Sequence, residues 1–238
     1  MVSAIASVHS VNLGDQVAQR LREMILRRDL QNGMRLLEEN LASQFEVSRG
    51  PIRDAFRQLE REGLVRTRNR GVYVVSLTAE DIGHLYDLRK ALELLAITGA
   101  MSRATQQQRE ELANCVEKMR AAAVVDDHEA FAVADVSFHG LLFTSSGNRR
   151  LSDVWRQYMP ILATILQSTV GQEEHLHNSA EAHNTLLEMI NSSSDGVLAE
   201  ASAHIDRARD RMVKAYENLS DTSRLSASSR DALAQPAG

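Results

Sequence analysis

The stretch from residue 38 to residue 75 constrains the fold more than any other part of the chain. A short helical pattern ends at a tight turn, and a longer one follows over residues 49–62, with Ser48 as its expected N-cap. Two apolar runs then flank Arg68-Asn69-Arg70-Gly71, which predicts a hairpin whose glycine takes a positive φ. This order of elements predicts a winged helix-turn-helix, a fold that lays its second helix in the DNA major groove.

The longer helix of this region combines an apolar face with a basic one. Its apolar residues recur at helical spacing and are Ile52, Ala55, Phe56 and Leu59. Arg49 and Arg53 lie one turn apart on the opposite side, where they are expected to meet the duplex. Arg57 drifts roughly 80° further round the helix and is expected to contact phosphate rather than a base.

Charge is divided unevenly along the chain, although its sum is only −5. Residues 12–75 have a net charge of +3, and all their basic residues are arginines. The remainder of the chain has a net charge of −8. Guanidinium forks suit bidentate contacts to phosphate or guanine, so we expect Arg66, Arg68 and Arg70 of the wing to grip the backbone or a minor groove. The alternative is a solvated basic face on a winged helix that binds protein.

Beyond residue 76 the sequence shows helical patterns and no strand pattern. Thr78 and Asp81 form a capping-box signature at the start of a run of helices expected over 79–103, 106–124, 127–146, 150–170, 176–191 and 195–218. With a first helix over 13–28, we predict a mainly α protein, in which a winged helix-turn-helix precedes an all-α antiparallel helical bundle.

The predicted domain plan has four parts. Residues 12–76 form the DNA-binding domain, and residues 77–218 form the helical domain. Residues 1–11 are expected to be a flexible N-terminus and residues 219–238 a disordered tail, because the tail is rich in Ser, Ala and Asp without periodicity. Cys115 is the one cysteine and no apolar run could cross a bilayer, so we expect a soluble cytoplasmic protein.

Four polar residues of the helical domain are spaced to converge. Asp135 and His139 are four apart on one predicted helix, and His183 and His204 are symmetrical about the turn between the last two helices. Three imidazoles and a carboxylate at one point would bind a divalent transition metal, Zn²⁺ first, with Ni²⁺ or Mn²⁺ as alternatives. The competing interpretation is a set of hydrogen-bonded core histidines.

The first domain resembles the winged-helix signature of GntR-family bacterial repressors. The resemblance rests on three segments and on Gly71 and Val74; the segments are Leu41-Ala42, residues 47–55 (VSRGPIRDA) and residues 59–65 (LEREGLV). It implies that Ser48, Arg49, Arg53 and the wing glycine contact the operator. Relatives carry an Arg where Glu39 stands, so that contact is not transferred.

The second domain resembles the metal-binding FCD effector domain of the FadR subfamily, over about residues 78 to 217. Asp135, His139, His183 and His204 match its ligand pattern, and six helices look more like the VanR-type subgroup. The resemblance also implies that Arg89 faces the ligand cavity and binds a carboxylate. From the residues alone, Arg89 and Glu93 could equally be a surface pair four residues apart.

Together these features predict a DNA-binding regulator that is not an enzyme. We expect a homodimeric repressor in the bacterial cytoplasm, associated with the nucleoid through an inverted-repeat operator, and controlled by a small carboxylate at the metal site. One alternative is a metal sensor or structural metal site without an organic ligand. Another is a metal-dependent hydrolase fused to a DNA-binding module, although no general base stands beside the site.

Overall fold

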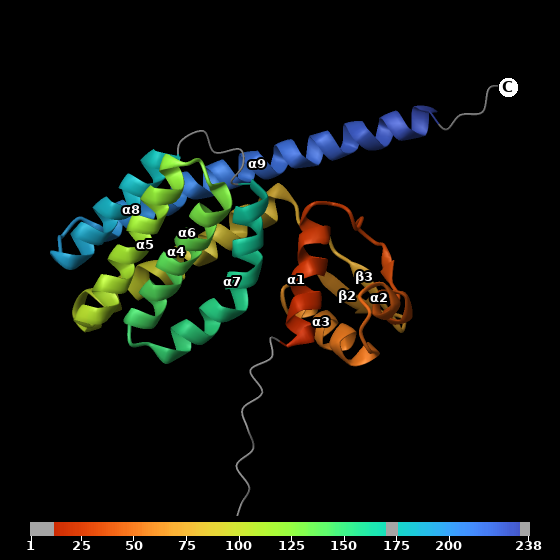
Figure 1. Ribbon diagram of the computed structural model, residues 1–238, viewed down its shortest axis with the longest axis horizontal. Coiled ribbons are helices and arrows are strands. Elements are labelled where there is room, and N and C mark those ends of the chain that lie inside the picture. The colour runs from red at the N-terminus through yellow and green to blue at the C-terminus, as the bar shows by residue number, and fades with distance from the viewer. Residues whose placement is uncertain (1–11, 170–175, 234–238) are drawn as a thin grey trace, which may run out of the picture. The chain divides into compact units, whose positions relative to one another are not determined.

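The computed structural model describes residues 12–169 and 176–233 of the chain (Figure 1). The chain divides into two compact units, residues 1–76 and residues 77–238. The first unit contains α1 Leu13–Leu26, β1 Arg35–Leu36, α2 Glu38–Gln44, α3 Arg49–Arg61, β2 Val65–Arg68 and β3 Gly71–Val74. The second contains α4 Ala79–Arg103, α5 Gln106–Val124, α6 His128–Ser145, α7 Arg149–Thr169, α8 Leu176–Asn191 and α9 Val197–Leu233.

The core of the first unit lies between α1 and α3. Leu21 and Ile25 of α1 are fully buried, as are Ile52 and Leu59 of α3. The apolar face predicted for α3 is therefore its buried face, and the other side of the helix is left to its arginines. Removing these side chains from water contributes about 1.5–3 kcal/mol each, which fixes how α3 is presented.

A three-stranded antiparallel sheet in the order β1-β3-β2 completes the first unit. The sequence analysis predicts the β2–β3 hairpin but not β1, because a strand of two residues is too short to show alternation. The predicted positive φ at Gly71 is wrong: Asn69 and Arg70 take it, at 46° and 59°. Gly71 is favoured for another reason: a Cβ there would lie 2.9 Å from the Tyr73 ring, so a larger residue would require that side chain to shift.

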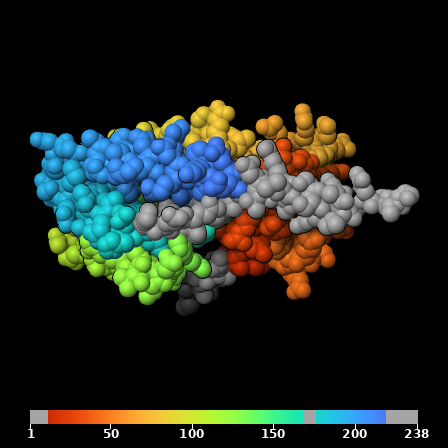
Figure 2. Space-filling model, turned by 90° about the horizontal axis from the view of Figure 1, so that it is seen from above, coloured from red at the N-terminus to blue at the C-terminus, as the bar shows by residue number. Residues whose placement is uncertain are grey.

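The second unit is the predicted helical bundle. In it α5 packs on α6, and α4 packs on α9 (Figure 1); α9, blue in Figure 2, forms part of the surface of this unit. The capping box that opens α4 is present, with the Thr78 amide donating to Asp81 at 2.7 Å and the Asp81 amide donating to the Thr78 hydroxyl at 3.1 Å. The predicted fold class is thus confirmed.

One boundary differs clearly from the sequence analysis. A disordered tail is expected from residue 219, but α9 continues to Leu233. No glycine or proline interrupts residues 197–233, so nothing in the covalent structure stops the helix before Pro236. The predictions for residues 1–11 and 234–238 lie outside the described residues. No helix in the described part of the chain is long and apolar enough to cross a membrane.

Candidate DNA-binding face and candidate metal centre

The exposed side of α3 carries the arginines predicted to read DNA. Arg49 and Arg53 are each 56% exposed at the side chain, and Arg57 is 74% exposed. Ser48 occupies the N-cap position with extended backbone, as predicted, but its side chain makes no capping hydrogen bond. Its hydroxyl therefore does not serve the helix terminus that the sequence analysis assigned to it.

Each reading-face arginine is paired with a carboxylate, which the sequence analysis does not predict. Arg49 donates to Glu39 at 2.9 Å, and Arg53 donates to Glu38 at 2.9 Å. Both acids lie in the first turn of α2. Exposed pairs of this kind contribute about 0–1 kcal/mol, so a phosphate or base edge can replace the carboxylate at low cost.

The wing places its arginines on and beside the hairpin turn. Arg66 and Arg68 belong to β2, and Arg70 sits in the two-residue turn between paired Arg68 and Gly71. All three are exposed. With α3, the wing gives the first unit two sets of exposed guanidinium groups suited to a polyanion.

In the second unit, the four predicted metal ligands come together in the interior. Asp135 and His139 lie on α6, His183 on α8 and His204 on α9, and all four are buried. One ring nitrogen from each histidine lies within 4.8 Å of the others. Asp135 lies 3.0 Å from His183 Nε2 and 3.9 Å from His139 Nε2.

The second nitrogen of two of these rings is already occupied. His183 Nδ1 lies 2.7 Å from the carbonyl oxygen of Ser179, which can only accept, so Nδ1 carries the proton. His139 Nδ1 lies 2.6 Å from Glu93 Oε1. The two Nε2 atoms then face each other at 3.2 Å as lone pairs, and they repel unless a cation, either a proton or a metal ion, lies among them.

The electrostatics favour the ligating forms of Asp135, His139 and His204. Burial, reinforced by Arg89, lowers the pKa of His139, and burial with the neighbouring His183 lowers the pKa of His204 well below its usual value. Burial opposes ionisation of Asp135, but the neighbouring His139 and His183 and the nearby Arg89 outweigh it and lower the Asp135 pKa. Neutral imidazoles and an ionised carboxylate are the forms that coordinate metals, so this donor set fits a divalent transition metal.

Arg89 and Glu93 extend the cluster on α4. Both side chains are buried, at 7% and 0% exposure, so the surface-pair interpretation of the sequence is wrong. Arg89 Nε donates to Glu93 Oε2 at 3.0 Å. Burial tends to raise the pKa of Glu93, but the neighbouring His139 and the Arg89 guanidinium lower it to about 2, so Glu93 is ionised.

Two small cavities flank the cluster, and both are lined by Tyr86, Arg89 and Asp135. One extends past His139 to Trp155, and the other past His183 and His204 to Arg211. Each holds about 10 Å³, the space of a single water molecule. An organic acid therefore fits there only if side chains move.

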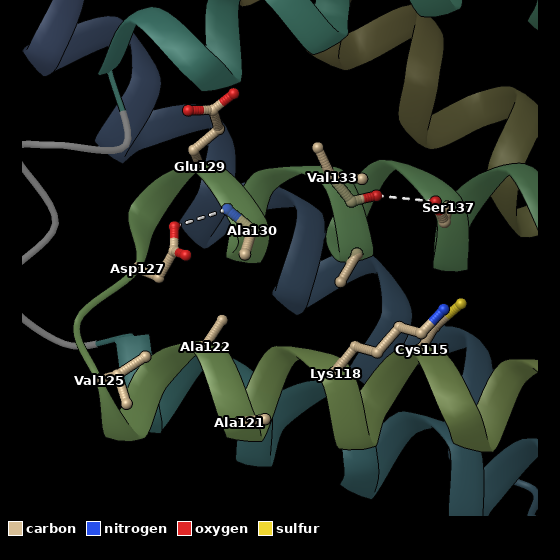
Figure 3. Close-up of a pocket in the computed structure, with 11 residues that line it drawn as sticks. Cys115, Lys118, Ala121, Ala122, Val125, Asp127, Glu129, Ala130, Val133 and Ser137 are labelled. Atoms are coloured by element: carbon tan, nitrogen blue, oxygen red, sulfur yellow. Dashed lines mark hydrogen bonds between the residues drawn. The ribbon is translucent and has the colours of Figure 1, made fainter.

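A wider groove of about 650 Å³ lies between α5 and α6, away from the histidines (Figure 3). Its walls are mostly Ala and Val, and its charged members are Lys118 on α5, Glu129 on α6 and Asp127 just before α6. Asp127 at one end caps α6 by accepting from the Ala130 amide at 2.9 Å. The groove has no imidazole among its lining residues and offers no comparable ligand set.

A winged helix with exposed arginines on its second helix, in one chain with a helical unit, is the architecture of a DNA-binding regulator. Residues 13–75 match the bacterial regulatory proteins of the gntR family, and residues 84–207 match the FCD domain. The chain therefore belongs to the GntR family of transcriptional regulators, with an FCD domain as its second unit. Members of this family are regulators and not enzymes.

Individual relatives agree with this placement. The chain is 29% identical to the gluconate operon transcriptional repressor of Bacillus licheniformis over 64% of its own length and 63% of that protein. It is 30% identical to the Nta operon transcriptional regulator of Aminobacter aminovorans over 76% of its length and 86% of that protein. Among solved structures, E. coli McbR/YncC shares the fold with a TM-score of 0.70 and 21% identity, covering 87% of this chain and 100% of that one.

Proposed function

We propose that this regulator is a repressor whose operator affinity is set by a small organic acid bound at a metal site in the FCD unit. The ligands are Asp135, His139, His183 and His204, and the metal is Zn²⁺, with Ni²⁺ or Mn²⁺ as alternatives. When bound, the metal supplies a Lewis-acidic centre with coordination positions left for a carboxylate.

The observation that carries this proposal is the facing pair of imidazole nitrogens. With Nδ1 of His183 committed to Ser179 and Nδ1 of His139 committed to Glu93, both Nε2 lone pairs point at one place beside Asp135. Core histidines that serve only packing satisfy each other as donor and acceptor. A set that presents only acceptors to one point is suited to a cation.

Charge argues for an anionic effector. A divalent cation with one Asp135 carboxylate leaves about one positive charge, and the Arg89 guanidinium lines both adjoining cavities. The gluconate repressor among the relatives is named for a hydroxy acid, the chemical class that a metal with an adjacent guanidinium would chelate.

The small volume of the cavities supplies the mechanical step. Since about 10 Å³ is available on either side, the acid must displace side chains on α4, α6, α7, α8 or α9 to enter. A ligand that binds only the displaced arrangement shifts the population toward it. In a homodimer, that shift alters the spacing of the two winged helices and weakens binding to an inverted repeat.

The proposed regulator acts in the cytoplasm. Its DNA contacts are assigned to the first unit. We assign base reading to Arg49 and Arg53, assisted by Ser48, and phosphate contacts to Arg57. The wing residues Arg68, Arg70 and Gly71 are assigned to the backbone or the minor groove. The fold does not determine which base sequence is recognised, so the operator duplex used below is selected from randomised sequences.

The test measures the affinity of the full chain for a selected duplex by fluorescence anisotropy. It uses metal-free protein, zinc-loaded protein, and zinc-loaded protein with gluconate, lactate or citrate. We expect at least one acid to weaken binding about fivefold or more, the usual lower range of allosteric coupling, and His183→Ala to abolish the response. An operator affinity that no metal or acid changes would contradict the proposal.

A second candidate is a metal sensor without an organic ligand, favoured by the same 10 Å³ cavities. It differs in one measurable respect, because metal alone would then change the operator affinity. Zinc titration at fixed duplex concentration separates the two: a full response to zinc with no further effect of any acid identifies the sensor.

A further inference from the structure

Glu93 is a fully buried carboxylate in the middle of α4, and its two oxygens serve different partners. Oε2 accepts from Arg89 Nε at 3.0 Å, while Oε1 lies 2.6 Å from His139 Nδ1, 46 residues further along the chain. A simple ion pair would turn both oxygens to the guanidinium fork. Here one carboxylate oxygen bonds to Arg89 on α4 and the other to His139 on α6, so Glu93 does more than neutralise Arg89.

This division of the carboxylate fixes which nitrogen of His139 carries the proton. Arg89 only donates, so Glu93 accepts from it at Oε2, and a carboxylate held by a guanidinium also accepts at Oε1. His139 Nδ1 must therefore present its hydrogen to Oε1, and Nε2 keeps its lone pair. That lone pair points at His183 Nε2, 3.2 Å away, and toward Asp135.

We propose that Glu93 is a positioning residue for the metal site, which holds His139 in the Nδ1–H tautomer so that Nε2 is free to coordinate. Arg89 holds the Glu93 carboxylate in place for this task through the hydrogen bond to Oε2. The inference rests on the proposed metal site and deepens it, because it gives one residue outside the ligand set control over a ligand's protonation. The group that orients a ligating imidazole typically changes metal affinity 10–100-fold.

The arrangement also gives Arg89 two competing partners. An effector carboxylate that draws the guanidinium toward the cavity loosens its hold on Glu93, and Glu93 in turn holds His139. The chain Arg89–Glu93–His139 thus links the acid to the metal ligand through two hydrogen bonds of 3.0 and 2.6 Å.

Glu93→Gln is a sharp test because the amide has one acceptor and one donor end. The Arg89 guanidinium requires the amide oxygen, so the NH₂ group faces His139 and donates to Nδ1. The proton then moves to Nε2, the wrong nitrogen for coordination. We expect zinc affinity to fall 10–100-fold, measured by competition with a chromophoric chelator.

A second variant separates this effect from loss of packing. In Arg89→Met/Glu93→Gln the guanidinium is gone, so the amide oxygen is free to accept from His139 Nδ1 again. We expect this double variant to recover most of the zinc affinity lost in the single one. Glu110→Gln, an exposed change on α5, is the matched control and leaves zinc affinity unchanged.

The tautomer is read directly, without metal, from long-range ¹H–¹⁵N spectra of imidazole-labelled protein at pH 7.5, with His139 assigned through His139→Gln. We expect Nδ1–H in the wild type and Nε2–H in Glu93→Gln. An Nε2–H tautomer in the wild type overturns the inference, and this measurement needs no variant at position 93 to fold.

The zinc and tautomer measurements distinguish failure of the positioning role of Glu93 from failure of the proposed metal site. If the wild type binds zinc and Glu93→Gln binds it equally well, the positioning role is overturned while the metal site stands. If the wild type binds no zinc, the proposed function fails, and the tautomer spectra still decide whether Glu93 controls His139.

Discussion

Arginine–glutamate pairs occur in both units, and their surroundings set what each pair does. Arg49 and Arg53 meet Glu39 and Glu38 at the surface, where each guanidinium side chain is 56% exposed. Arg89 meets Glu93 at a similar distance with almost no exposure. The surface pairs are weak and exchangeable, which suits the DNA contacts that we propose for these two arginines. The buried pair cannot exchange with water and holds a fixed geometry.

The difference follows burial and not the unit. Arg22 on α1 and Glu62 just beyond α3 are buried at 1% and 4% exposure, and they form two hydrogen bonds of 2.7 Å. This bidentate pair ties the C-terminal end of α3 to α1. The first unit thus fixes α3 with a buried pair and leaves Arg49 and Arg53, the arginines proposed to read DNA, in exposed pairs.

The largest effect is expected from breaking that buried pair. Arg22→Ala leaves Glu62 buried and unpaired, so the stability of the first unit should fall by about 3–5 kcal/mol. Hydrogen exchange of the α1 and α3 amides in the full chain measures it. Arg22→Met/Glu62→Leu removes both charges and should be much less destabilised; a loss under about 1 kcal/mol in Arg22→Ala would show that burial does not separate the two kinds of pair.

Metal loading should give the next largest effect, and only in the second unit. Zinc at 100 times its dissociation constant should add about 2.7 kcal/mol to that unit's stability, because it binds the folded form. Hydrogen exchange of α6 and α8 amides measures the gain, with His183→Ala as the variant that loses it. Equal stabilisation of α1 and α3 would contradict a site confined to the FCD unit.

On the exposed side, Arg53→Ala should cost about 1–3 kcal/mol of operator binding and relax base preference. Arg68→Ala should instead weaken binding to all sequences alike, because Arg68 is assigned to phosphate. It should reduce the slope of log affinity against log salt by about 1. Anisotropy titrations at several salt concentrations on selected and scrambled duplexes separate the two. If neither substitution changes binding, the assignment of the reading face is wrong.

Removing a competing surface carboxylate should have a smaller and opposite effect. Glu39→Gln releases Arg49 and removes a negative charge beside DNA, so operator affinity should rise by up to about 1 kcal/mol, or fivefold. The gain should shrink at high salt, because exposed charges are screened. Glu110→Gln in the other unit serves as control, and a Glu39→Gln protein that binds DNA more weakly would mean that the pair helps to order Arg49.

The smallest effect concerns pH and the start of α4. The hydrogen bonds from Thr78 lower the pKa of Asp81 below its ordinary value of 3.8. A carboxyl whose folded pKa is depressed stabilises the fold above its unfolded pKa, and the contribution is lost as pH falls through the folded pKa. Protection of the first α4 amides, measured relative to their intrinsic exchange rates, should therefore fall below about pH 4 in the wild type and be lower than in the wild type at neutral pH in Thr78→Ala.

The sequence predicts contacts that follow from spacing along one element or across one turn. Asp135 and His139 are four residues apart on one helix, so their proximity is predicted from the helical repeat. His183 and His204 are equally far from the turn between α8 and α9, so antiparallel helices place them opposite each other. Glu93 meets His139 across 46 residues and between two helices, and no periodicity encodes that contact. The burial of Arg22 could not be predicted either, because in the sequence it looks like a surface arginine of an amphipathic helix. Its partner Glu62 lies 40 residues further along the chain.

Reciprocal linkage between acid and operator tests the control mechanism most directly. The affinity of the zinc-loaded full chain for an acid identified in the operator assay is measured by calorimetry, with and without saturating operator duplex. The account predicts that the operator weakens acid binding by the same factor by which the acid weakens operator binding. Equal acid affinities in the two titrations would contradict it.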